Sequence, residues 1–291
     1  MAQPTPEEVG RLQATFQDKD FSAHGSTWDS LWKDAYTPWD RQGPSMALND
    51  LLMADDPATA SLFPALHPTA TTTATGKPPK ALVPGCGRGH DVLLLSAFGY
   101  DVTGLDTSAK AMDEAAENAK AMGDDPVYVP RVGIAASKGS VTWLVADFFD
   151  GAWLSGVAAA DGGFDLIFDY TFFVALPIEA RPKWAKRMAE LLKPGTGRLV
   201  CLEWPLTKPP STGGPPWGVT ADAYVAHLGH PGEDIPYTKD GHVEVTAQSS
   251  SSSISSAGLK RLGRFKPTRT HKAGYDSDGK ITEFISVWGR P

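Results

Sequence analysis

The chain has 291 residues, of which 41% are hydrophobic and 21% charged, and its formal charge at pH 7 is −7. These fractions are those of a globular protein with a substantial core, and the acidic balance with scattered Lys and Arg residues argues against a nucleic-acid partner. The acidic start of the chain and the lack of any apolar run of about 18 residues predict no signal peptide, no membrane span and a cytoplasmic location.

Helices are predicted for about the first 55 residues, before any strand begins. Val9, Leu12 and Phe16 have helical spacing, and a tryptophan-rich stretch follows them. The Thr/Ala-rich run at 69–79 is typical of a linker. We therefore expect a helical lid over residues 1–68 and then a linker that leads into a sheet.

From residue 80 the pattern alternates between short apolar strands and helices. The predicted strands cover 80–85, 101–106, 140–149, 164–173 and 197–205, and the predicted helices cover 90–99, 108–123, 179–195 and 220–229. Such alternation implies an α/β fold with a mainly parallel sheet flanked by helices. Insertions are expected at 124–140 and 205–258, and the strand candidates 262–272 and 280–290 predict an antiparallel C-terminal edge. The whole chain, 1–291, is interpreted as a single domain with a core at 80–291.

The loop after the first predicted strand, in the sequence ALVPGCGRGHD, is rich in glycine. Glycine lets a backbone approach a ligand closely, and the following helix presents its positive end there. Asp106 ends the next strand, 21 residues after Gly85, where a carboxylate suits ribose hydroxyls. Gly85, Gly87 and Gly89 form G-x-G-x-G, whereas a dinucleotide fingerprint would need glycine at His90. The loop alone suits NAD and S-adenosylmethionine alike, and its spacing counts against a pyrophosphate.

Two features further along the chain favour the sulfonium cofactor. Asp147 and Phe148 end the third predicted strand, where an acid can accept from an adenine amine and an aromatic ring can cover the base. The turn LLKPGTGRL at 191–199 resembles the segment before the fifth strand of S-adenosylmethionine-dependent methyltransferases. Residues 80–205 as a whole resemble a Rossmann-like class I methyltransferase.

A closer resemblance is to the thiol, thiocyanate and halide methyltransferases related to thiopurine methyltransferase. The segments that carry it are TPWDRQGP, LVPGCGRGHDV, FDLIFDYTFF, RPKWAKRMAELLKPG, GGPPWGV and LKRLGRF. The resemblance implies S-adenosyl-L-methionine as cofactor and a small thiol, thiocyanate or halide as methyl acceptor. The cofactor-binding residues that it implies are Trp28, Trp32, Trp39, Gly85, Gly87, Asp106, Thr107, Asp147 and Phe148.

The acceptor side is predicted at the end of the fourth strand. Tyr170 matches a position near the acceptor in the plant enzymes, and Asp169 and Tyr170 are the candidate catalytic residues. Two positions depart from the family pattern: Val174 replaces a cysteine, and Glu203 is expected to reshape the acceptor pocket. Cys86 is explained by loop packing rather than by nucleophilic chemistry, and no metal site is predicted.

The predicted chemistry is an in-line displacement, for which a thiolate or a halide needs no general base. Other interpretations stay open. The tryptophans and Tyr170 also suit plain core packing. The protein is alternatively a thiopurine or other small-molecule S- or O-methyltransferase, a regulatory protein that binds S-adenosylmethionine without catalysis, or an NAD-dependent oxidoreductase. We expect a monomer, because no apolar surface stretch stands out.

Overall fold

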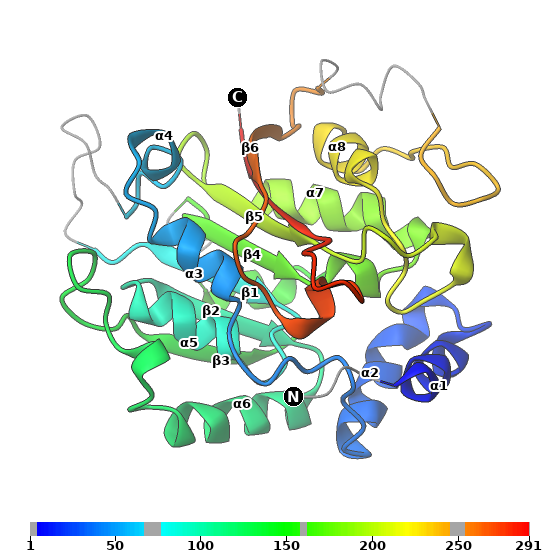
Figure 1. Ribbon diagram of the computed structural model, residues 1–291, viewed down its shortest axis with the longest axis horizontal. Coiled ribbons are helices and arrows are strands. Elements are labelled where there is room, and N and C mark those ends of the chain that lie inside the picture. The colour runs from blue at the N-terminus through cyan, green and yellow to red at the C-terminus, as the bar shows by residue number, and fades with distance from the viewer. Residues whose placement is uncertain (1–4, 67–76, 158–161, 245–253, 291) are drawn as a thin grey trace.

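A computed structural model describes residues 5–66, 77–157, 162–244 and 254–290 (Figure 1). Its centre is a seven-stranded sheet in the order β3-β2-β1-β4-β5-β7-β6. Five neighbouring strands run parallel, and β7 pairs antiparallel with both β5 and β6. The strands are β1 (Lys80–Pro84), β2 (Asp101–Asp106), β3 (Val141–Val145), β4 (Leu166–Tyr170), β5 (Arg198–Glu203), β6 (Lys260–Phe265) and β7 (Phe284–Gly289). The predicted parallel sheet with an antiparallel C-terminal edge is confirmed.

Helices cover both faces of this sheet. On one face α3 (Met46–Leu52) and α5 (His90–Ala97) share a buried apolar cluster with the strands. On the other face α7 (Arg181–Leu191) and α8 (Ala221–Gly229) share a second cluster. Helix α6 (Ala109–Ala121) begins where the Ser108 hydroxyl accepts from the Ala111 amide at 3.3 Å, as its cap position predicts.

The N-terminal helices lie at the carboxyl ends of the parallel strands. Helix α1 (Pro6–Phe16) begins with a capping box between Thr5 and Glu8, and α2 (His24–Lys33) packs against α1 and α6. Helix α3, which stands within the predicted lid 1–68, packs against one face of the sheet, and the bounds of the lid stay a prediction. A four-residue helix, α4 (Pro57–Ala60), follows α3.

The predicted linker and insertions contain little regular secondary structure where the structure describes them. Most of the predicted linker 69–79 and of the Ser-rich run within 205–258 lies outside the described residues. The predicted insertion 124–140 is irregular apart from one 3-10 turn, Pro126–Tyr128. Strand β6 ends at Phe265, two residues before a proline that cannot donate to a strand ladder. Among the described residues, no helix is both long enough and apolar enough to cross a membrane.

Candidate active site

A cavity of about 410 Å³ lies between the N-terminal helices and the carboxyl ends of the parallel strands. Parallel α/β sheets bind their ligands at this edge. The structure brings all the predicted cofactor-binding residues to the wall of this cavity: Trp28, Trp32, Trp39, Gly85, Gly87, Asp106, Thr107, Asp147 and Phe148.

The glycine-rich loop forms part of the cavity wall because no side chain fits there. Gly85 and Gly87 have φ angles of +60° and +52°, which residues with a Cβ rarely adopt. A Cβ atom at Gly85 would lie 2.6 Å from Cδ2 of Phe172, and one at Gly87 would lie 3.3 Å from Cζ2 of Trp32. The two glycines therefore leave backbone open to a ligand.

Asp106 provides a buried carboxylate at the end of β2. One of its oxygens accepts from the Gly87 amide at 3.2 Å and the other from the Ser108 amide at 3.1 Å. Burial raises the pKa of Asp106 to about 6, and the backbone amides oppose this shift. Each carboxylate oxygen can accept more than one hydrogen bond, so Asp106 can also accept from hydroxyl groups in the cavity. This arrangement fits the ribose of the predicted cofactor.

Aromatic side chains line the opposite parts of the cavity. The ring of Trp39 meets Trp28 edge-on at 4.9 Å and Trp32 at 5.8 Å between centroids. Buried Phe148 meets Phe172 edge-on at 5.1 Å. Asp147 precedes Phe148 and has an exposed side chain that accepts from the backbone amide two residues later. Rings and an acid placed in this way suit an adenine and a cation.

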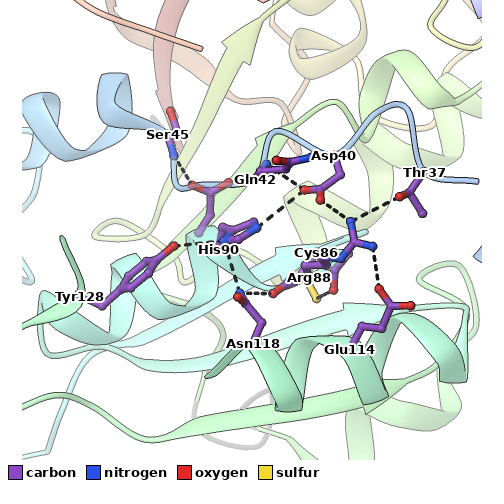
Figure 2. Close-up of polar contacts among 12 residues, drawn as sticks. Thr37, Asp40, Gln42, Ser45, Cys86, Arg88, His90, Glu114, Asn118 and Tyr128 are labelled. Atoms are coloured by element: carbon purple, nitrogen blue, oxygen red, sulfur yellow. Dashed lines mark hydrogen bonds and ion pairs between the residues drawn. The ribbon is translucent and has the colours of Figure 1, made fainter. Parts of the chain in front are cut away.

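The glycine-rich loop is tied to the segment that carries Trp39 (Figure 2). Arg88 forms ion pairs with Asp40 and, at 2.8 Å, with Glu114. His90 contacts the Tyr128 hydroxyl at 3.1 Å, and burial lowers the pKa of its imidazole. These contacts give His90 a structural role, in line with the absence of any chemistry assigned to it from the sequence.

The two candidate catalytic residues lie in different surroundings. The carboxylate of Asp169 accepts from the Trp184 indole at 2.8 Å and from the Phe173 amide at 3.1 Å, and it does not line the cavity. Asp169 therefore positions the chain after β4 instead of meeting a substrate. Tyr170 lines a smaller adjoining cavity, and its hydroxyl has no hydrogen-bond partner in the described part of the chain.

Two other expectations concern residues near the strand ends. Glu203 is fully buried, forms an ion pair with Arg264 at 2.8 Å and is not a wall residue of either cavity, and its effect on the acceptor pocket stays a prediction. Burial raises the pKa of the Cys86 thiol, which keeps it protonated and unreactive. Within the described ranges, no group of three or more His, Cys, Asp or Glu side chains is placed to hold a metal ion.

Several residues of the cavity walls were not predicted from the sequence. Phe172, Lys208 and Trp204 line the main cavity, Arg41 lines both cavities, and His271 lines the smaller one. The Lys208 ammonium donates to the carbonyl oxygens of residues 213 and 216, and burial lowers its pKa to about 8. Arg41 and Phe172 stand in the segments TPWDRQGP and FDLIFDYTFF, which could have pointed to them. Lys208, Trp204 and His271 lie outside the quoted segments, and only their proximity to the cavities in the folded chain identifies them.

The strand order, the glycine-rich loop after β1 and the acid that ends β2 define the class of protein. The chain is a Rossmann-like, S-adenosyl-L-methionine-dependent methyltransferase. A family model confirms the resemblance seen in the sequence. Residues 23–257 match the model of thiopurine S-methyltransferase, and the chain belongs to that family.

Individual relatives agree with this assignment. "Thiocyanate methyltransferase 1" of Brassica oleracea is 34% identical over 263 residues, which cover 90% of this chain and 91% of the relative. "Probable thiol methyltransferase 2" of Arabidopsis thaliana is 30% identical over 245 residues, which cover 84% and 85%. A solved structure described as "Conversion of a Disulfide Bond into a Thioacetal Group during Echinomycin Biosynthesis" is 18% identical, with a TM-score of 0.50 and coverage of 91% and 92%. That likeness concerns the fold alone.

Proposed function

We propose that this protein transfers a methyl group from S-adenosyl-L-methionine to a small thiol, thiocyanate or halide. The observation that carries the proposal is the main cavity, which gathers the predicted cofactor-binding residues and adjoins a smaller polar cavity at Tyr170. Relatives named as thiocyanate and thiol methyltransferases support this choice of acceptor.

The residues of the main cavity suit each part of the cofactor. Gly85 and Gly87 leave space for its methionine part, Asp106 accepts from its ribose hydroxyls, and Asp147 with Phe148 takes its adenine. When bound, S-adenosyl-L-methionine supplies a methyl group on a sulfonium cation, and transfer of that group to an anion requires no proton removal.

The protein's own contribution is to align and desolvate the acceptor. Trp28, Trp39 and Phe172 line the cavity with aromatic surface, which excludes water from a nucleophile. Holding two reactants in line can contribute up to roughly 7–11 kcal/mol to a reaction of this kind. The Tyr170 hydroxyl keeps its proton available to donate to the acceptor, since no acceptor for it occurs among the described residues, and Asp169 holds the following turn in place.

A direct assay of products tests the proposed acceptor. The protein is incubated with S-adenosyl-L-methionine and, separately, thiocyanate, iodide, hydrosulfide, an aromatic thiol or a phenol. S-adenosylhomocysteine and the methylated product are both quantified. We expect the first three acceptors to react. If only the aromatic thiol or only the phenol reacts, the proposed acceptor is wrong and the reacting compound represents the acceptor class. Cofactor binding without any methylated product would indicate a regulatory protein.

A matched pair of variants tests whether the cavity holds the cofactor. Gly85→Ala puts a Cβ atom against Phe172, whereas Gly133→Ala carries a similar positive φ, +84°, with no atom within 4 Å. Both changes strain the backbone, and only the first fills the cavity. We expect Gly85→Ala to abolish S-adenosylhomocysteine binding measured by calorimetry and Gly133→Ala to retain it. Equal binding by both variants would show that the cofactor lies elsewhere.

A further inference from the structure

The smaller cavity, of about 70 Å³, adjoins the main cavity of about 410 Å³. The two share part of their walls: Trp32, Trp39, Arg41, Gly85, Gly87 and Thr171. The wall of the smaller cavity also includes Tyr170 and His271. The main cavity is about six times larger, so a ligand that enters the smaller one alongside the cofactor has to be small.

Polar groups without partners gather around the smaller cavity. Arg41 Nε, the Tyr170 hydroxyl and His271 Nε2 are buried atoms that have no hydrogen-bond partner among the described residues. Tyr170 is only 8% exposed, and its ring stacks on His271 with 5.5 Å between centroids and 3° between planes. A buried polar group left unpaired destabilises the folded protein, so such groups call for a ligand or water.

Two guanidinium groups lie in the wall of this cavity. Arg88 is paired with Asp40 and Glu114, and Arg41 has no ion pair among the described residues. Its guanidinium carbon lies 4.7 Å from the ring centroid of Trp204 and 5.9 Å from that of Tyr170. Contacts with aromatic faces stabilise a cation without neutralising it. No ion pair involving Arg41 occurs in the part of the chain that the structure describes, so the guanidinium is available to an anion.

The carboxyl groups of Asp40 and Asp91 line the same cavity, and each has a partner of its own. Asp40 forms an ion pair with Arg88. Asp91 accepts from the Ser45 amide at 2.7 Å, and burial raises its pKa to about 7. These two carboxyl groups therefore do not provide Arg41 with a dedicated counter-ion.

Two further titratable groups face Arg41 from the C-terminal part of the chain. A carboxyl oxygen of Glu283 accepts a hydrogen bond from the Thr270 hydroxyl, and burial raises the pKa of Glu283 to about 8. Burial and the charge of Arg41 lower the pKa of His271 to about 4. At neutral pH both groups are mainly uncharged, so neither of them provides Arg41 with a counter-ion.

We infer that Arg41, Tyr170 and His271 form a binding site for a small monovalent anion, and that this anion is the methyl acceptor. The inference rests on the proposed function and names the residue, Arg41, that selects the charged form of the acceptor. An anion in this site accepts hydrogen bonds from the guanidinium N–H groups of Arg41 and from the Tyr170 hydroxyl. The cavity wall shared with Gly85 and Trp39 places it next to the cofactor-binding residues.

Anomalous diffraction from crystals soaked in iodide, with S-adenosylhomocysteine bound, locates the site without relying on activity. We expect an iodide peak within contact distance of the Arg41 guanidinium and the Tyr170 hydroxyl. The peak should disappear in crystals of Arg41→Gln and persist in crystals of Lys186→Gln, a charge-matched change at an exposed position on α7. Iodide found only on other surfaces would overturn the inference.

Steady-state kinetics with thiocyanate test whether the site serves the reaction. Loss of one hydrogen bond to a charged group predicts a KM for thiocyanate raised roughly tenfold to hundredfold in Arg41→Gln. The KM for S-adenosyl-L-methionine should change less than about twofold, since the methionine, ribose and adenine contacts assigned above involve other residues. Arg41→Lys should recover most of the loss, and Tyr170→Phe should raise the KM while keeping the ring stack with His271.

The two experiments separate failure of the inference from failure of the proposed function. A wild-type protein that methylates none of thiocyanate, iodide and hydrosulfide contradicts the proposed function. An active wild-type protein whose Arg41→Gln variant keeps the same KM for thiocyanate contradicts the anion site alone.

Discussion

Substitution of Asp106 by Asn should weaken cofactor binding and change the pH dependence of stability at the same time. The carboxylate is the proposed acceptor for ribose hydroxyls, and a hydrogen bond to a charged group contributes about 1.5–3 kcal/mol. The Kd for S-adenosylhomocysteine at pH 7.5 should therefore rise roughly tenfold to hundredfold in Asp106→Asn. In the wild-type protein, affinity should fall between pH 7 and pH 5, because a pKa of about 6 means that the carboxylate becomes protonated there.

The raised pKa of Asp106 also predicts the direction in which folding stability changes with pH. Burial raises the pKa of Asp106 from its ordinary value of 3.8 to about 6, so the folded state binds a proton more tightly than the unfolded state. This contribution to stability is fully present below pH 3.8 and is lost as the pH rises through 6. Stability is lost at about 1.4 kcal/mol per pH unit until the pH reaches the folded pKa of about 6. Between pH 5 and pH 8 only the first pH unit lies below that pKa, so the loss over this range is about 1.4 kcal/mol.

Urea unfolding of the ligand-free wild type and Asp106→Asn at pH 5 and pH 8 measures this loss. The free energy of unfolding of the variant minus that of the wild type should be about 1.4 kcal/mol larger at pH 8 than at pH 5, because only the wild type loses this contribution. Other buried acids contribute equally to both proteins and cancel in the difference. Asp113→Asn, an exposed change on α6, serves as control and should show no such difference. A pH-independent difference, or an unchanged Kd, would refute the reasoning.

Three further changes test the packing around the site. Thr171 has a φ of +70°, so Thr171→Gly should raise the free energy of unfolding by about 1 kcal/mol in urea titrations, and a fall would contradict the strain. Glu283→Gln removes a carboxyl group whose pKa burial raises to about 8. Wild-type stability should decline more steeply than that of Glu283→Gln from pH 6 to pH 9, and parallel thermal-melting curves would count against this. Trp184→Phe leaves Asp169 without its indole donor and should cost about 1–3 kcal/mol of folding stability, whereas a loss below about 0.5 kcal/mol in urea would show that the bond contributes little.

The sequence predicted the elements whose signals are local. Gly85, Gly87 and the cap at Ser108 follow from their immediate neighbours, and Asp106 follows from its place at the end of a strand. These features were enough to predict the mainly parallel sheet, and the residues proposed to bind the cofactor line one cavity.

The acceptor side depends on contacts between distant parts of the chain. Neighbouring residues of a strand point to opposite faces, so Asp169 and Tyr170 separate even though they are adjacent in sequence. His271 reaches Tyr170 from the segment between β6 and β7, and Arg264 reaches Glu203 from β6. No spacing rule relates residues so far apart, and their side chains meet only because the C-terminal hairpin pairs with β5.

The ties between the glycine-rich loop and the segment around Trp39 have a consequence for ligand exchange. Arg88, His90 and Asp91 contact Asp40 and Ser45, so the segment that carries Trp39 and the glycine-rich loop form one connected part of the cavity wall (Figure 2). Helix α1 reaches that wall mainly through apolar contacts and one hydrogen bond from the Tyr36 hydroxyl to the Glu8 carbonyl at 2.5 Å. We therefore expect opening of α1 to set the rate at which S-adenosylhomocysteine leaves, while the tryptophan wall stays in place between turnovers.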